Sequence, residues 1–444
     1  MSRAGWAQIE ITPPLGLPMG GRGSRFTPGA EVLDPLLAQA LVLEDAAGER
    51  LLWITMDMIG MSYNATSELR FELMAATGIP FAAIVINASH THSGPMTGFE
   101  GYATLKPKPP EMQAYERGLI PQTVRMVREA IGRLAPAVVR VHWGQSDIGI
   151  NRRRRDDSGD MGMGPDPDGA YNRDLWVLNM AAGDGRCVVF SYGCHPVLVY
   201  GFAYDGISAD WPGVCRNRLQ AALGPKVQAQ FLQGLAGNVR PRQVADLEKG
   251  IFRKPTTAED HIVAGTELAG DVMAALKEEG EVLELELAAV AGFALVPRDQ
   301  RKVLPLAHWQ ELAARDDELS QNVGAYWAER IETGLPPVPV VPWSIGLMRL
   351  AQGHRIAWMS GEPLAEWLGH LREWLGDDKL VAWGYCQDGR CYMPTDEVIP
   401  EGGYEVVPSN TYNKSGPAPF AVGINAVAKR ALLELASRLG SSRG

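Results

Sequence analysis

Hydrophobic and polar residues alternate along this chain in short blocks that predict closely spaced strands and helices. Apolar runs of strand length, bounded by turn residues, alternate with stretches whose apolar residues have helical spacing. The pattern predicts an α/β fold class with mixed β-sheets flanked by helices. The predicted strands are residues 36–44, 50–56, 81–86, 137–144, 174–181, 187–194, 227–232, 283–290, 344–351, 355–359 and 379–385. The predicted helices are residues 67–77, 112–134 with a kink or break at Pro121, 211–223, 257–278, 306–333 and 364–374.

Composition narrows the possible classes of protein. With 444 residues, 46% of them hydrophobic and 21% charged, the chain can bury a substantial core. The net charge of -10 argues against nucleic acid as a partner. No apolar run approaches the roughly 20 residues of a membrane span, and the N-terminus lacks the apolar segment of a signal peptide. The five cysteines form no Cys-X-X-Cys pair, so we expect neither a disulfide framework nor a thiolate metal site.

One stretch stands out because two histidines follow directly after a predicted buried strand. Residues 87–95 read Asn-Ala-Ser-His-Thr-His-Ser-Gly-Pro. If the backbone stays extended there, the rings of His90 and His92 point to the same side, with Cα atoms about 6.5 Å apart. This spacing suits two roles at one metal centre, but histidines in such a loop also serve only to hydrogen-bond the backbone. Both interpretations stay open at this point.

Other polar residues also stand where a predicted strand ends. His195 follows one strand, and Glu362 lies between a strand and a helix, where a carboxylate also compensates the helix dipole. Asp57 ends another strand and is either a turn carboxylate or a group that orients a nearby histidine. The four arginines at 152–155 favour a solvated loop, or the mouth of a site for an anionic substrate, over contact with nucleic acid.

Together these motifs resemble those of the neutral/alkaline non-lysosomal ceramidases. The chain is similar to their N-terminal catalytic domain and resembles a short bacterial-type homologue. The His-Thr-His-Ser-Gly-Pro string is the specific part of the resemblance, and the other motifs follow in the family's order over almost the whole chain. The resemblance implies the ceramidase catalytic-domain fold, with a metal site built at strand ends. The other motifs are Ile11-Thr-Pro-Pro14, Asn151-Arg152, His195-Pro196, Ile207-Ser-Ala-Asp210, residues 231–241, Ser360-Gly-Glu362, and Tyr392-Met-Pro-Thr395 followed by Glu401-Gly-Gly-Tyr-Glu405.

The resemblance also implies a ligand set for a catalytic zinc ion, Zn2+. His90, His195, Glu362 and Tyr392 match the family's metal ligands, and Tyr385 is the alternative to Tyr392 because it lies only seven residues earlier. Two imidazoles, a carboxylate and a phenol oxygen form a donor set that suits zinc. A water molecule in the remaining position would lose a proton near neutral pH and become the nucleophile.

Two further residues match family members that act on the substrate. His92, beside the metal, is expected to transfer a proton to the leaving amine. Arg152 is expected to stabilise the oxyanion of the tetrahedral intermediate, an effect of several kcal/mol in other enzymes, on the order of 3 kcal/mol.

The chain departs from the family where ceramidases have an active-site serine. Their Gly-Asp-Val-Ser-Pro-Asn is Gly237-Asn-Val-Arg-Pro-Arg242 here, so Arg240 takes the place of the serine and joins the catalytic candidates. A planar cation suits a carboxylate or phosphate better than a sphingoid tail. The chain also ends before the extra C-terminal β domain of the long ceramidases and lacks their secretion signal. We therefore expect residues 1–444 to form a single ceramidase-like catalytic domain. We expect it to be located in the cytoplasm, or else to be a mature form whose signal was removed.

The predicted function is hydrolysis of the linear amide C–N bond of an N-acyl compound by a zinc-bound water. The substrate is expected to be a small molecule, smaller or more anionic than ceramide. One alternative is a zinc-dependent esterase or lactonase on the same scaffold, and the other is a non-catalytic zinc-binding homologue in which Arg240 has cost the activity. The acyl and amine parts of the substrate, the oligomeric state and a second metal near Asp57 stay open.

Overall fold

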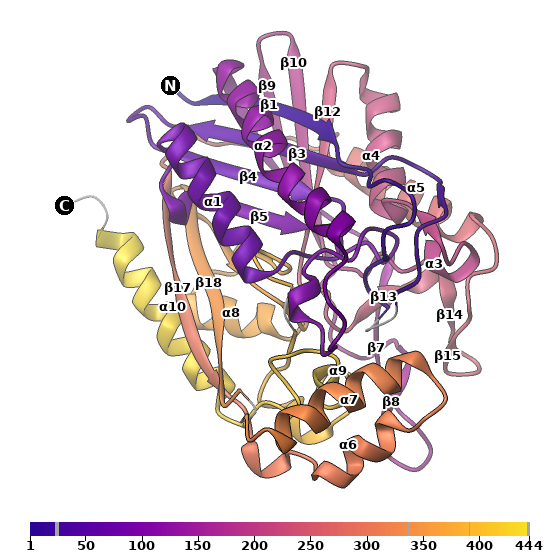
Figure 1. Ribbon diagram of the computed structural model, residues 1–444. Helices are drawn as coiled ribbons and strands as arrows, with labels where there is room; N and C mark the ends of the chain where they lie inside the picture. The colour runs from indigo at the N-terminus through magenta and orange to yellow at the C-terminus, as the bar shows by residue number, and fades with distance from the viewer. Residues whose placement is uncertain (23–25, 336–337, 390, 442–444) are drawn as a thin grey trace.

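The computed structural model describes residues 1–22, 26–335, 338–389 and 391–441 (Figure 1). Helices alternate with strands in several mixed sheets, which confirms the predicted α/β class. The largest sheet has nine strands in the order β12-β10-β9-β6-β1-β3-β4-β5, with β16 beside β6. Its strands are β1 (Arg3–Glu10), β3 (Leu37–Glu44), β4 (Arg50–Met56), β5 (Ile84–Ala88), β6 (Ala135–Gln145), β9 (Asp174–Ala182), β10 (Gly185–Tyr192), β12 (Val227–Gln233) and β16 (Glu281–Val282).

This sheet folds over on itself between β1 and β6, which pair only through Arg3 and Ala4. As a result β12 lies against β3, and Gln39 Nε2 donates to the Ala229 carbonyl at 2.8 Å. Helices α1 (Tyr63–Thr77) and α2 (Pro110–Gly132) pack on β1, β3 and β5. On the other half, α4 (Asp210–Leu223) and α5 (Glu259–Ala275) pack on β12, β6 and β9. Helices therefore cover both halves of the folded sheet from outside.

A second sheet joins the first through aromatic packing. It has the order β17-β18-β19-β21, and its strands are β17 (Ala288–Pro297), β18 (Val340–Ala351), β19 (His354–Met359) and β21 (Val381–Trp383). Helix α10 (Ile424–Ser441) packs along β17 and β18 and also contacts α8 (Trp367–Leu375). The Trp383 ring meets the Trp53 ring of β4 edge-on, with centroids 4.9 Å apart. This contact brings the end of β21 close to the first sheet.

Shorter elements complete the described chain. The two-stranded sheets are β2 (Glu31–Val32) with β11 (Gly206–Ile207), β14 (Ala245–Asp246) with β15 (Ile251–Phe252), and β20 (Glu362–Pro363) with β22 (Tyr392–Met393). A three-stranded sheet has the order β13 (Val239–Pro241), β7 (Gly149–Arg155), β8 (Met161–Asp166). The remaining α-helices are α3 (Val199–Phe202), α6 (Leu306–Ala313), α7 (Glu318–Glu332) and α9 (Pro408–Thr411). All five cysteines are buried and none forms a disulfide bond. No helix among the described residues has the length and apolar character needed to span a membrane.

Several predicted elements differ from the observed ones. The predicted helix 306–333 is two helices, because Asp317 caps a new one by accepting from Ser320 N at 2.8 Å. Pro121 does not interrupt α2, and residues 283–287 lie outside any strand. The hairpin of β7 and β8 was predicted as a loop because its strands carry arginines instead of an apolar face. The C-terminal helix α10 was not predicted.

Asn87 joins the two edge strands of the folded sheet. Its side chain is fully buried, accepts from Gln233 N at 2.9 Å and donates to the Gly384 carbonyl at 2.8 Å. We expect Asn87→Ala to lower the free energy of unfolding by about 2 kcal/mol, because buried partners lose their hydrogen bonds. Chemical denaturation would measure this, with the exposed Asn217→Ala on α4 as the control. Equal stability of the two variants would contradict the structural role of Asn87.

Candidate metal centre

The candidate site lies where the ends of several strands converge. His90 and His92 follow β5, and His195 follows β10 by three residues. Glu362 and Tyr392 lie opposite each other in the parallel pair β20 and β22. Gly361 makes this pairing possible, since it has a left-handed φ of 72° and a Cβ there would stand 2.5 Å from the Cys391 carbonyl oxygen. Five predicted site residues from distant parts of the chain therefore meet at one place.

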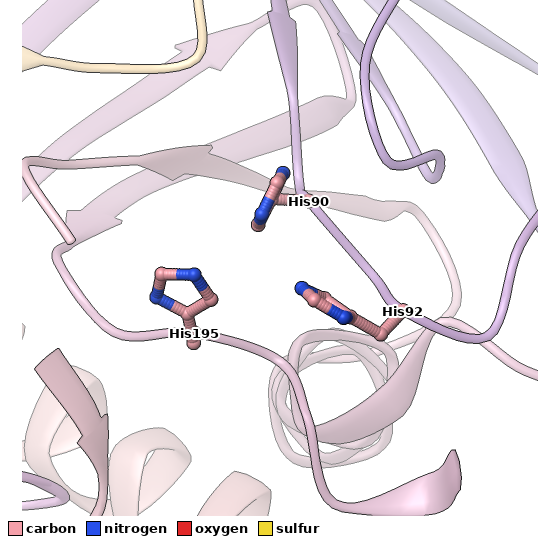
Figure 2. A group of neighbouring side chains, drawn as sticks. All are labelled: His90, His92 and His195. Carbon is pink, nitrogen blue, oxygen red and sulfur yellow. The ribbon is translucent and has the colours of Figure 1, made fainter. Parts of the chain in front are cut away.

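Three imidazole rings form the centre of the site. One ring nitrogen each from His90, His92 and His195 lies within 4.8 Å of the others, and Figure 2 shows the rings turned toward a common space. The ring centroid of His90 lies 5.0 Å from that of His92 and 5.0 Å from that of His195. His90 and His195 are buried, and His92 is partly exposed. This cluster favours the metal interpretation of the His-X-His string.

The backbone of this string is not extended, so the predicted geometry was wrong. His90 has a left-handed φ of 67°, and its ring stands at 84° to that of His92. Such a conformation is costly for a residue with a side chain and is typical of functional sites. The His92 ring stacks on the ring of Tyr200 in α3, with centroids 5.8 Å apart. The two histidines thus face the same space from different directions.

Backbone carbonyls fix the tautomer of two of the rings. His90 Nδ1 lies 2.7 Å from the Ile59 carbonyl oxygen, and His195 Nδ1 lies 2.7 Å from that of Ala236. Because a carbonyl only accepts, each Nδ1 carries the proton and each Nε2 presents its lone pair. Both Nε2 atoms lie 3.2 Å from the same carboxylate oxygen, Glu362 Oε2.

Two tyrosines border these three groups. The Tyr392 hydroxyl lies 3.4 Å from His195 Nε2, and its ring is nearly parallel to the imidazole at an angle of 12°. The Tyr385 ring is 4.4 Å from that of His90, and its buried hydroxyl has no hydrogen-bond partner among the described residues. Of these two tyrosines, Tyr392 therefore has its hydroxyl close to His195 Nε2, whereas Tyr385 packs its ring against His90.

Burial sets the charge states of the histidines. Burial, with the nearby Arg152, lowers the pKa of His195 to about 4. Burial, with His90 and His195, also lowers the pKa of His92 well below its ordinary value. Burial raises the pKa of Glu362, but its two imidazole neighbours outweigh this effect and hold it well below the ordinary value. At neutral pH an ionised Glu362 therefore faces a neutral His195.

Arg152 is held by an acid from a distant loop. Its Nε donates to Glu405 Oε1 at 2.7 Å, and Arg153 Nη1 donates to Glu405 Oε2 at 2.8 Å. The Arg152 guanidinium lies over the Tyr392 ring at 5.3 Å, and its buried Nη2 has no hydrogen-bond partner among the described residues. Arg152 and Arg153 are 4% exposed, so the prediction of a solvated loop was wrong for both.

Two other candidates point elsewhere. Arg240 Nη1 lies 3.5 Å from Met163 Sδ, and its guanidinium stacks over Phe252 at 4.9 Å. Burial lowers the pKa of Arg240. Asp57 forms an ion pair with Arg216 and accepts from Leu37 N at 2.9 Å, so it orients neither histidine. The carbonyl of Ile59 takes that role for His90.

A cavity of about 400 Å³ opens beside the centre. His90, His92, Glu362 and Tyr392 line it, whereas Arg152 and Arg240 are not among its described lining residues. Sequence reasoning missed several lining residues because only the fold brings them here. Among them are Tyr102, Tyr404, Tyr412, Asn413 and Lys414, and Tyr404 was quoted only as part of a motif.

No family model matches the sequence, and no curated protein matches it at the level of sequence. Among solved structures, the chain is similar to neutral ceramidase from Pseudomonas aeruginosa, with a TM-score of 0.72 and 18% identity over 99% of this chain and 74% of that one. A structure described as ceramidase complexed with C2 matches with a TM-score of 0.72 and 17% identity, over 98% of this chain and 75% of that one. These similarities confirm the predicted resemblance in fold.

Proposed function

We propose that this chain, which has the fold of neutral ceramidase, is a zinc-dependent hydrolase that cleaves linear amide bonds of N-acyl compounds. The observation that carries the proposal is the contact of two imidazole Nε2 atoms with one carboxylate oxygen at 3.2 Å. The lone pairs of the two Nε2 atoms and the negative carboxylate oxygen repel one another unless a positive charge lies between them. A cation held by His90, His195 and Glu362 removes that conflict.

The donor set fits zinc in type and in spacing. Zinc–nitrogen and zinc–oxygen bonds of about 2.0–2.2 Å at a tetrahedral centre place ligand atoms about 3.3–3.6 Å apart. The distances of 3.2 Å to Glu362 Oε2 and 3.4 Å from the Tyr392 hydroxyl to His195 Nε2 are close to this value. When bound, zinc would act as a Lewis acid that activates water at neutral pH. His92 faces the same space from another side, so it is not needed as a ligand and can transfer a proton.

The residues of the chain would then carry the proton and stabilise the charge. Nε2 of the neutral His92 has no hydrogen-bond partner among the described residues, so it can take a proton from the attacking water and deliver it to the leaving amine. Water oxygen joins the carbonyl carbon, the C–N bond breaks, and the amine leaves with that proton. Arg152 lies outside the described lining of the cavity and interacts with Tyr392, and its Nη2 would donate to the developing oxyanion from behind this tyrosine.

The cavity supports a compact substrate. Its volume of about 400 Å³ lies toward the low end of the range for small-molecule sites, roughly 300–1,000 Å³. Polar groups from Ser62, Asn413 and Ser415 share its wall with the tyrosines. The small volume suits a short N-acyl compound better than one with two long alkyl chains, and it supports the proposal that ceramide itself is a poor substrate.

The proposal is tested by a substrate panel offered to the purified protein before and after treatment with a chelator. The panel holds short N-acyl amides, the matching esters, lactones and a ceramide. We expect hydrolysis of the short amides, its loss after chelation and its return with zinc. Faster turnover of esters or lactones than of amides would overturn the assignment of the bond, and turnover that survives chelation would overturn the role of the metal.

The position of His92 depends on Gly21, which lies against its ring. A Cβ at Gly21 would stand 2.4 Å from His92 Nδ1. We expect Gly21→Ala to lower kcat/KM for amides at least tenfold with the metal content unchanged, because the ring must move. Gly16→Ala is a matched control, since Gly16 also has a left-handed φ but no atom within 4 Å of the added carbon. Equal kinetics of both variants would contradict the role of His92.

A further inference from the structure

The cavity beside the histidines has a single lysine or arginine among its described lining residues, Lys414. The acids among the described lining residues are Glu362 of the proposed centre, Asp388, and Glu100, which forms an ion pair with Lys108 at 2.5 Å. No carboxylate of the described residues lies within the 4.0 Å of an ion pair from Lys414 Nζ. Glu100 attracts the Lys414 ammonium only from beyond ion-pair distance. The cavity therefore joins an ammonium with no close ion pair among the described residues to the proposed reaction centre.

The chain holds Lys414 in this position. Its backbone N–H donates to the Gly101 carbonyl at 2.8 Å, and the preceding residue Asn413 forms a β-bridge with Tyr102. The ammonium lies 5.7 Å from the ring centroid of Tyr326 on α7. Burial lowers the pKa of Lys414, Arg330 adds to this effect, and Glu100 offsets it only in part from beyond ion-pair distance. A bound carboxylate would give the ammonium a close partner.

Arg240 is less suited to this task. Its guanidinium is covered by Met163 and Phe252, and it is absent from the described lining of the cavity. The sequence suggested an anionic substrate because of Arg240, but the cation that a ligand in the cavity would meet is Lys414. The two positions come from different segments, so they can be tested separately.

We propose that Lys414 binds a carboxylate of the substrate, so that the preferred substrates are anionic linear amides. Two sources supply such a carboxylate. It belongs to the amine part in N-acyl amino acids and to the acyl part in monoamides of dicarboxylic acids. This inference rests on the proposed amide hydrolysis and adds the group that selects the substrate.

The test compares each acid with its own methyl ester, in which the negative charge is absent. Two substrate series are used, N-acyl ω-amino acids and dicarboxylic monoamides, each with increasing spacer length. The readout is the ratio of kcat/KM for acid and methyl ester within one variant, measured for the wild type, Lys414→Met, Lys414→Arg and Lys106→Met. Lys106 is a matched control, because it lies outside the described cavity lining and forms an ion pair with Glu318 at 2.5 Å.

We expect the wild-type ratio to reach about tenfold or more in one series, which identifies the source of the carboxylate. The ratio should fall to about one in Lys414→Met, recover in part in Lys414→Arg and stay high in Lys106→Met. A ratio near one in the wild type, or a high ratio that survives in Lys414→Met, would overturn this inference while amide hydrolysis stands. No hydrolysis of any acid or ester in the wild type would overturn the proposed function itself.

Discussion

Replacing Glu362 with glutamine is expected to lower kcat/KM for amide hydrolysis about a thousandfold or more, on the order of 4 kcal/mol in activation free energy. The glutamine keeps the shape of the side chain but removes the negative charge that faces both imidazoles at 3.2 Å. Without that charge the site holds a divalent cation far more weakly. Steady-state kinetics on a short N-acyl amide would measure the loss.

The control for this variant is Glu373→Gln, an exposed position on α8 in the same part of the fold. Thermal unfolding of both variants would separate a damaged site from a damaged fold. If Glu362→Gln retains more than a tenth of the wild-type kcat/KM with zinc present, Glu362 is not a metal ligand in the active enzyme.

Replacing Arg152 with methionine is expected to lower kcat/KM by about 10²–10³-fold while the metal content stays unchanged. Glu405 fixes the guanidinium through Nε and leaves the buried Nη2 without a partner among the described residues. That arrangement prepares a hydrogen-bond donor for an oxyanion before the substrate binds. Kinetics and metal analysis on the same preparation would separate loss of this donor from loss of the metal.

Arg155→Met is the matched control, because Arg155 lies on the same strand but is exposed and pairs with Glu401 at 3.0 Å. Arg152→Lys keeps the charge but not the planar fork, so it should recover only part of the activity. Full activity in Arg152→Met, with normal metal content, would remove this residue from the mechanism.

Elements with a strong local pattern could be predicted from the sequence. Strand 36–44 is almost wholly buried and was predicted within one residue of β3, since its apolar run is bounded by polar turns. Strand β7 was missed because its inner residues are arginines, and their neutralising partner Glu405 lies about 250 residues later. No local pattern contains such a pairing.

Local sequence also shows part of the candidate site but not all of it. The positions of His90 and His195 after strands could be predicted, because each follows an apolar run of strand length in a recognisable motif. The left-handed backbone of His90, the shared oxygen of Glu362 and the place of Lys414 in the cavity depend on contacts between distant segments. The substitution at Arg240 was visible in the sequence, but its packing against Phe252 was not.

The zinc site is tested most directly by the metal content of the purified wild type beside that of His90→Ala and Glu362→Ala, determined by elemental analysis at equal protein concentration. We expect close to one zinc ion per wild-type chain and far less in both variants, with folding verified by circular dichroism. Equal zinc in all three folded proteins, or none in a wild type that hydrolyses amides, would contradict the assignment of His90 and Glu362 as zinc ligands.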